Sequence, residues 1–195
     1  MKHDYSELVV TISGPLDAEA ITQVINQAYR PDTNAVGWTH ESDLVSGNRI
    51  CVAQVEQIIS RPESVILVGF NNADIVACVH VEKNGCNSSI GMLAVSPTLQ
   101  GSGVGKRMLE YAEQYAVEHF SAEKFILTVL SSRTELIAFY LRRGYQHTGQ
   151  MQDYPVHAGI GKPKFSNLTT ETLEKQAHRN KTKGHPIRGE YYENT

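Results

Sequence analysis

The 195-residue sequence has few cysteines and no long apolar run. Its three cysteines, Cys51, Cys78 and Cys86, are too few and too scattered for a disulfide framework, and their spacing matches no zinc-binding pattern. No stretch reaches the roughly 18 consecutive apolar residues of a membrane span, and no apolar segment of signal-peptide type follows the first residues. We therefore expect reduced thiols, no metal site, no membrane contact and a cytoplasmic location.

The sequence also has no excess of positively charged residues. The chain has 18 Lys and Arg against 21 Asp and Glu, a formal net charge of -3. General nucleic-acid binders carry a strongly basic surface, so no nucleic-acid partner is expected. A local phosphate site is still compatible with this charge. Apolar residues make up 41% of the chain, and its length suits one domain with a substantial core.

Hydrophobic periodicity predicts strands and helices in one domain, residues 7–175. Apolar residues recur at helical spacing between Asp17 and Pro31 and over 52–59, 104–119 and 133–143, and runs of strand length cover 8–12, 65–70, 75–81, 90–95, 125–130, 145–152 and 169–175. The order βααβββαβαββ predicts an α+β domain, a mixed central sheet with helices on both faces. Residues 176–195 are polar and have almost no aliphatic side chains, which is typical of a tail.

Local signals refine this outline. Asp17 is expected to cap the first helix through its side chain, and Gly144 to end the last helix in a left-handed conformation. Residues 38–49 are expected to form a loop with a helical turn. Residues 153–168, with two prolines and two glycines, are expected to be a loop.

A glycine-rich turn, residues 100–106 (QGSGVGK), lies between a predicted strand and a predicted helix. Exposed backbone N–H groups and the positive end of a helix favour a phosphate there. Two nucleotide motifs fail at this turn. A P-loop requires glycine where Gln100 stands and Ser or Thr where Arg107 stands, and the dinucleotide fingerprint requires its third glycine one residue after Gly105.

The turn, preceded by the strand ending in 93–97 (LAVSP), resembles the acetyl-CoA motif Q/R-x-x-G-x-G/A of the GNAT superfamily of N-acetyltransferases. Residues 133–145 (RTELIAFYLRRGY) resemble a second signature of this superfamily, a helix that ends in an aromatic residue followed by glycine and another aromatic residue. The element order over most of the chain is also similar to that fold.

The resemblance implies an acetyl-CoA site. The strand that contains Leu93, Ala94 and Val95 would splay from the next strand, and its backbone would pair with the pantetheine arm. The N–H groups of the glycine turn would hold the pyrophosphate, and the residues of that turn are Gln100, Gly101, Ser102, Gly103, Val104, Gly105 and Lys106. Arg133 occupies the position at which many members contact the cofactor through an asparagine.

Tyr140 matches the tyrosine that protonates the departing CoA thiolate in many members. The chemistry agrees, because a phenol with a pKa of about 10 can donate a proton to a thiolate beside it. A packed core aromatic is the structural alternative for this residue.

The sequence does not identify the residue that accepts the proton of the amine. Glu41, His80 and Glu82 are candidates, and His80 and Glu82 share one face of their strand. A base that acts through water, or an amine that arrives neutral, is equally compatible. On the acceptor side, Trp38 and Glu41 are expected to receive a cationic amine.

The resulting prediction is acetyl transfer from acetyl-CoA to a primary amine by direct attack in a ternary complex. The alternative is a non-catalytic acyl-CoA-binding or sensor module of the same fold. The sequence leaves the identity of the amine open, and it leaves both a monomer and a homodimer open as assembly states.

Overall fold

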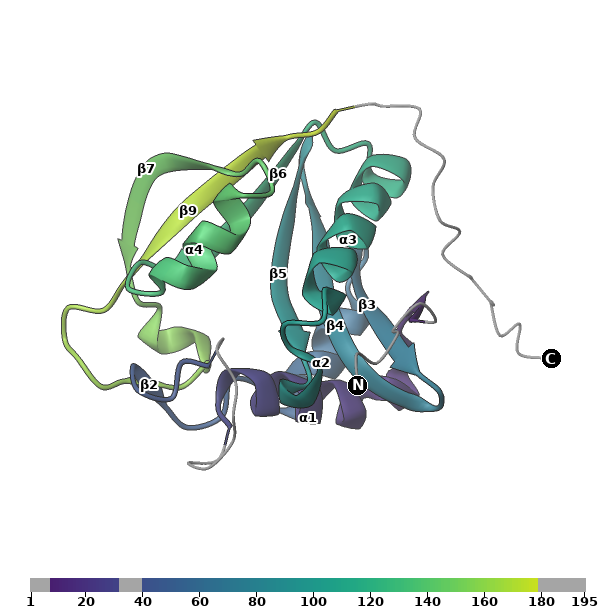
Figure 1. Ribbon diagram of the computed structural model, residues 1–195, viewed down its shortest axis with the longest axis horizontal. Helices are drawn as coiled ribbons and strands as arrows, with labels where there is room; N and C mark the ends of the chain where they lie inside the picture. The colour runs from purple at the N-terminus through teal and green to yellow at the C-terminus, as the bar shows by residue number, and fades with distance from the viewer. Residues whose placement is uncertain (1–7, 32–39, 179–195) are drawn as a thin grey trace.

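The computed structural model describes residues 8–31 and 40–178. Seven strands form one sheet in the order β1-β3-β4-β5-β6-β9-β7 (Figure 1). Their bounds are β1 Val9–Ile12, β3 Ser64–Asn71, β4 Asp74–Asn84, β5 Asn87–Val95, β6 Lys124–Leu130, β9 Thr169–Gln176 and β7 Gln146–Asp153. β5 and β6 run parallel and all other neighbours are antiparallel, which confirms the mixed sheet.

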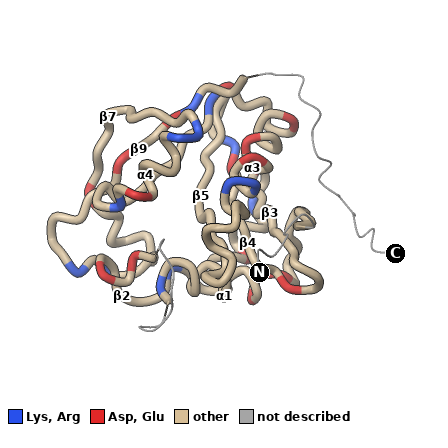
Figure 2. The backbone as a smooth tube through the Cα atoms, in the orientation of Figure 1, with Lys and Arg blue, Asp and Glu red and all other residues tan. Residues whose placement is uncertain are grey.

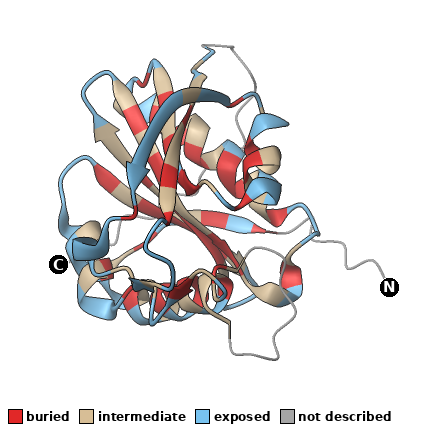
Figure 3. Cartoon of the chain, turned by 90° about the vertical axis from the view of Figure 1, so that its left-hand side faces the viewer, coloured by how far each residue is buried: buried red, intermediate tan, exposed pale blue. Residues whose placement is uncertain are grey.

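Helices cover both faces of the sheet, as predicted. α1 (Ala18–Tyr29) and α2 (Val52–Ser60) pack through one apolar cluster, which includes Ile21 and Val55 and strand residues such as Val68. α3 (Val104–Phe120) and α4 (Thr134–Leu141) bury their apolar sides in a second cluster on the opposite face. Figure 3 shows buried residues on the central strands and on the inner sides of the helices, whereas the edge strand β7 is exposed.

β5 and β6 pair only at their first residues, from Asn87↔Lys124 to Ser89↔Ile126. Beyond Ser89 the two strands separate, as Figure 1 shows below their common upper end. A bulge contributes to this divergence, because Met92 and Leu93 of β5 lie opposite a single residue of β4, and Met92 has a left-handed φ of 48°. The sheet therefore opens at its centre, and the backbone of β5 from Ile90 to Val95 has no strand partner on that side.

Two local predictions are corrected by the structure. Asp17 does not cap α1 with its side chain; its Oδ2 accepts a hydrogen bond from the Gly14 N–H at 2.8 Å instead. The segment 153–168 is more than a loop, because it contains a 3-10 turn, η3 (Val156–Ala158), and the strand β8 (Lys162–Pro163). β8 pairs with β2 (Val45–Ser46), so the connection after β7 is tied to the connection after α1.

The cap predicted at Gly144 is confirmed, with a φ of 88°. Within 8–31 and 40–178, no helix combines the length and the apolar character needed to cross a membrane. The proposed tail begins at Gln176, the last residue of β9, and from residue 179 onward it lies outside the described residues.

Candidate active site

Two cavities lie where β5 and β6 separate. The first, here the glycine-turn cavity, has a volume of about 280 Å³ and is bordered by the turn before α3, the end of β5 and α4. The second, here the central cavity, has a volume of about 480 Å³ and lies between β5, β6 and the ends of α1 and β7. Tyr29, Arg133 and Leu136 line both cavities, so the two spaces meet at these side chains.

The glycine turn has an open backbone. Gly101 and Gly103 have φ values of 81° and 92°, a region that L-residues rarely adopt, and a Cβ at either position would meet nothing within 4 Å. Gly103 is the residue before α3, so the first N–H groups of that helix point out beside the turn. This geometry fits a phosphate-bearing ligand.

Five of the seven predicted turn residues line this cavity: Gln100, Gly101, Gly103, Gly105 and Lys106. The other two do not. The Ser102 hydroxyl donates a hydrogen bond to the Leu99 carbonyl at 2.5 Å, and the Val104 side chain is buried in the core. Val104 can therefore offer a ligand only its backbone, whereas the exposed Ser102 hydroxyl points away from the cavity lining.

The predicted strand residues alternate as a strand requires. Leu93 and Val95 line the glycine-turn cavity, whereas Ala94 points to the opposite face and packs in the cluster with α1. Tyr29, which the sequence analysis did not identify, donates a hydrogen bond from its hydroxyl to the Leu93 carbonyl at 3.4 Å. Tyr29 thereby borders the unpaired edge of β5 at the junction of the cavities.

Four cations line the glycine-turn cavity: Lys106, Arg133, Arg142 and Arg143. No acidic residue is found among the described residues of its lining. Figure 2 shows the basic positions at the start of α3 and at the end of α4. Arg143 packs over the Phe139 ring, 3.4 Å from the ring centre, and its Nε is buried without a hydrogen-bond partner in the described chain.

The two arginines at the end of α4 were missed as ligand-binding candidates. From the sequence they are explained by the helix dipole alone. They line the cavity because α4 packs beside the glycine turn, a contact between segments distant in the sequence. The excess of positive charge and the open turn together fit the phosphates of a nucleotide-containing ligand such as CoA.

Glu41 and Arg133 belong to a buried ion-pair cluster. The Glu41 carboxylate accepts a hydrogen bond from Arg30 Nη1 at 2.5 Å on Oε2 and one from Arg133 Nη1 at 3.1 Å on Oε1. All three side chains are less than 10% exposed. Both carboxylate oxygens are therefore already held by guanidinium groups, and Glu41 has no oxygen without a cationic partner for an incoming amine.

Tyr140 lies on α4 and lines the central cavity. Its ring packs edge-to-face against Phe139 and Tyr145, so it also belongs to the core. Burial, followed by the neighbouring Tyr29, raises the pKa of Tyr140 above its ordinary value, and the hydroxyl stays protonated at neutral pH. No hydrogen bond occupies this hydroxyl among the residues that the structure describes.

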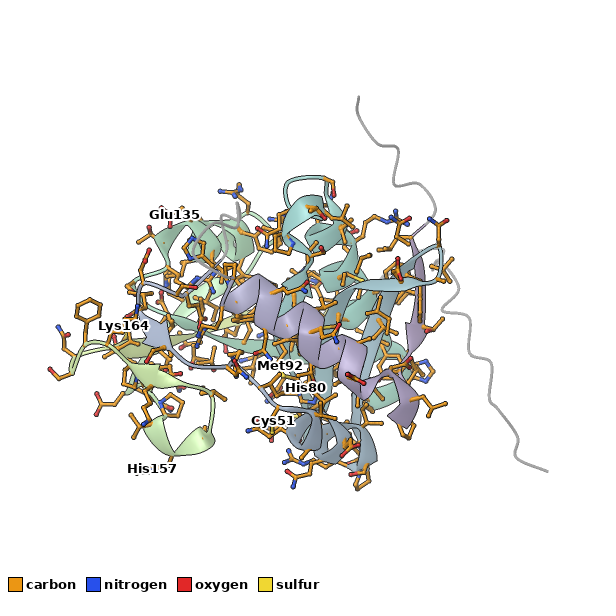
Figure 4. All side chains as sticks on the ribbon, turned by 90° about the horizontal axis from the view of Figure 1, so that it is seen from below. Cys51, His80, Met92, Glu135, His157 and Lys164 are labelled. Atoms are coloured by element: carbon orange, nitrogen blue, oxygen red, sulfur yellow. The ribbon has the colours of Figure 1, made fainter. Side chains whose placement is uncertain are left out.

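His80 and Met92 both line the central cavity and lie close together in Figure 4. The Ser64 Oγ lies 3.1 Å from the Ile58 carbonyl oxygen and 2.9 Å from His80 Nε2, within hydrogen-bond distance of both. When the Ser64 proton is directed to Ile58, Oγ accepts a hydrogen bond from Nε2–H, and the lone pair of a neutral ring is on Nδ1. Burial lowers the pKa of His80, so the ring is neutral at pH 7.

The remaining acceptor-side candidates lie elsewhere. Glu82 is on the same strand but does not line the central cavity, and it pairs with Arg61 at 3.8 Å near the surface. Trp38 lies outside the described residues. No cluster of His, Cys, Asp and Glu side chains within 8–31 and 40–178 could hold a metal ion.

A comparison of the sequence with models of known protein families gives a match that fits this splayed sheet with a glycine turn before α3. Residues 23–145 match the model of the acetyltransferase (GNAT) family. The chain belongs to the GNAT family. The match includes both sequence signatures, the glycine turn and the helix carrying Tyr140. A comparison with curated protein sequences gives no match.

Solved structures share the GNAT fold with this chain. An N-acetyltransferase from Staphylococcus aureus Mu50 superposes with a TM-score of 0.67 at 12% identity, over 88% of this chain and 99% of that chain. The ribosomal-protein-S18-alanine N-acetyltransferase from Escherichia coli gives a TM-score of 0.65 at 13% identity, over 91% and 99%. A GNAT family acetyltransferase from Elizabethkingia anophelis with acetyl-CoA bound gives a TM-score of 0.61 at 14% identity, over 88% and 99%.

Proposed function

We propose that this GNAT protein transfers an acetyl group from acetyl-CoA to the nitrogen of a primary amine, within a ternary complex. The observation that carries the proposal is the junction of the two cavities at Tyr29, Arg133 and Leu136. One cavity has the open glycine turn and the cations that suit CoA phosphates. The other contains an unpaired phenol and a neutral imidazole, so the two ligands can meet directly.

Acetyl-CoA, when bound, supplies an acetyl group activated as a thioester. Lys106, Arg142 and Arg143 hold the phosphates together with the N–H groups at the start of α3. The unpaired backbone of β5, from Ile90 to Val95, offers N–H and C=O groups to the pantetheine arm and to the carbonyl oxygen of the thioester.

Two side chains of the central cavity handle the protons. His80 Nδ1 accepts one proton from the attacking amine, while Ser64 fixes the ring through Nε2. The C–N bond forms, the C–S bond breaks, and the Tyr140 hydroxyl gives one proton to the thiolate. The products are the acetylated amine and CoA thiol, and solvent returns the proton from His80 to Tyr140.

A non-catalytic acyl-CoA sensor of the same fold is the alternative function. The cation-rich glycine-turn cavity suits it equally well. The central cavity favours the enzyme, because a sensor has no need of an unpaired phenol and a base beside the end of the acyl-CoA site. The two functions differ in whether acetyl-CoA is consumed and CoA thiol is released.

The experiment is CoA-thiol release from acetyl-CoA with pooled primary amines, compared with pooled alcohols and with no acceptor. We expect release only with amines, together with acceptor mass increased by one acetyl group. Release that is equal without an acceptor indicates thioester hydrolysis and contradicts the proposal. Binding of acetyl-CoA without release in any pool supports the sensor.

A further inference from the structure

The charge that lines the central cavity is unbalanced. Its charged lining residues within the described chain are Glu41, Arg49 and Arg133. The single carboxylate of Glu41 is shared between Arg133 and Arg30, which stands behind it. Arg49 has no ion-pair partner among residues 8–31 and 40–178, so the described lining has an excess of positive charge.

The position of Arg49 is fixed by its backbone. Asn26 of α1 accepts hydrogen bonds on Oδ1 from the Arg49 N–H at 2.8 Å and from the Ile50 N–H at 3.2 Å. The guanidinium carbon lies 5.3 Å from the centre of the Tyr29 ring, at the junction of the two cavities. The guanidinium makes no hydrogen bond to a described residue, so its planar set of donors is available to a ligand.

These observations bear on which amine can enter. A guanidinium without a partner beside an aromatic ring suits a carboxylate, which it can bind through two parallel hydrogen bonds. Within residues 8–31 and 40–178, the cavity lining presents Arg49 and Arg133 to a second cationic group, and its single carboxylate, Glu41, is already paired with arginines. The same positive charges lower the pKa of an amine held nearby, which favours its neutral, nucleophilic form.

We infer that the acceptor carries a carboxylate as well as its amine, that is, a compact amino acid, and that Arg49 binds the carboxylate. This rests on the proposed N-acetyl transfer and specifies its substrate class. The cavity, with a volume of about 480 Å³, is large enough to admit an amino acid. The inference replaces the sequence-based expectation of a cationic acceptor at Glu41.

The test compares matched acceptors in three forms. Each of a panel of α- and ω-amino acids is assayed as the free carboxylate, as the carboxamide, and as the diamine in which a second amine replaces the carboxylate. Wild type is compared with Arg49→Gln and with Lys162→Gln, which removes one charge from an exposed residue outside the cavity. Binding of the same compounds to the CoA-saturated protein, measured by calorimetry, gives a readout independent of turnover.

For the best acceptor we expect kcat/KM to be at least about tenfold higher for the carboxylate than for the carboxamide, equivalent to roughly 1.4 kcal/mol. This preference disappears in Arg49→Gln and persists in Lys162→Gln. Carboxamides or diamines used as well as carboxylates overturn the inference and leave N-acetyl transfer intact. Absence of acetylation in all three forms overturns the inference alone if the pooled primary amines still release CoA thiol, and it overturns both proposals if they do not.

Discussion

Arg133 Nη1 lies 3.1 Å from Glu41 Oε1, and this ion pair joins the start of α4 to the segment after α1 across the junction of the two cavities. Because both side chains are almost fully buried, the pair fixes the relative positions of the two walls of the site. Arg30 completes the cluster from the end of α1. Glu41 therefore lines the central cavity with both carboxylate oxygens held by arginines.

A double-mutant cycle with Arg133→Met and Glu41→Gln tests this pair. Each single change leaves the other charge with fewer partners in a buried setting, so both variants lose stability. We expect a coupling energy of about 1–3 kcal/mol in the free energy of unfolding measured with denaturant. A coupling energy near zero would show that the two groups do not stabilise each other.

Replacing His80 by Gln tests the assigned base. The lowered pKa of His80 means that the ring loses its function only as pH falls below about 6.5, the usual value for histidine. We expect kcat/KM to fall by about 10²-fold in His80→Gln, and the acidic limb of the pH–rate profile to disappear.

Glu82→Gln is the matched control for His80, because Glu82 lies two residues away on β4 but does not line the cavity. Its kcat/KM is expected to stay within a few-fold of wild type. Ser64→Ala removes the acceptor of Nε2–H and should reduce kcat more than it raises KM. If Glu82→Gln loses activity and His80→Gln keeps it, the base is misassigned.

Charge reversal at Lys106 tests the phosphate site. Lys106 is exposed, and its ion pair with Glu110, at 3.7 Å, contributes little to the free energy of unfolding. The Lys106→Glu variant should therefore fold with a nearly unchanged Tm. We expect the Kd for acetyl-CoA to rise about tenfold at low salt, with a smaller difference at high salt because of screening. Lys164→Glu changes the charge equally at an exposed position outside the cavity. Equal Kd values for the two variants contradict the assignment.

Removal of residues 179–195 tests the prediction of a tail. The segment has few aliphatic side chains to bury, so we expect the Tm and the Kd for acetyl-CoA to be unchanged. Thermal unfolding with and without acetyl-CoA measures both. A loss of several degrees in Tm would mean that the segment packs on the domain or on a second copy of the chain.

Much of the fold could be predicted from the sequence because its signals are local. The helical spacing over 52–59, the strand-length runs over 65–70, 75–81 and 90–95, and the glycine turn each depend on a few neighbouring residues. The alternation of Leu93, Ala94 and Val95 likewise follows from strand geometry alone. The family match to residues 23–145 confirms the resemblance on which the predicted fold relied.

The parts that were missed depend on contacts distant in sequence. Arg49 and Tyr29 face the cavities because α1, the segment after β2 and the bulge at Met92 meet there. The pairing of β8 with β2 spans more than a hundred residues, and strands of two residues are too short to show a hydrophobic periodicity. The Asp17 carboxylate can accept a hydrogen bond either from an N–H in the first turn of α1 or from the Gly14 N–H, which it uses. The sequence alone does not distinguish these two donors.

The turnover of Tyr140→Phe decides whether Tyr140, in the central cavity, is the acid of the proposed acetyl transfer. Phe keeps the ring that packs against Phe139 and Tyr145 and removes only the proton donor. We expect kcat to fall by about 10²-fold under conditions where chemistry limits the rate, with little change in Tm or in the Kd for acetyl-CoA. Because burial raises the Tyr140 pKa, the wild-type rate should show no loss from this group up to pH 10. Wild-type turnover in Tyr140→Phe would contradict this assignment.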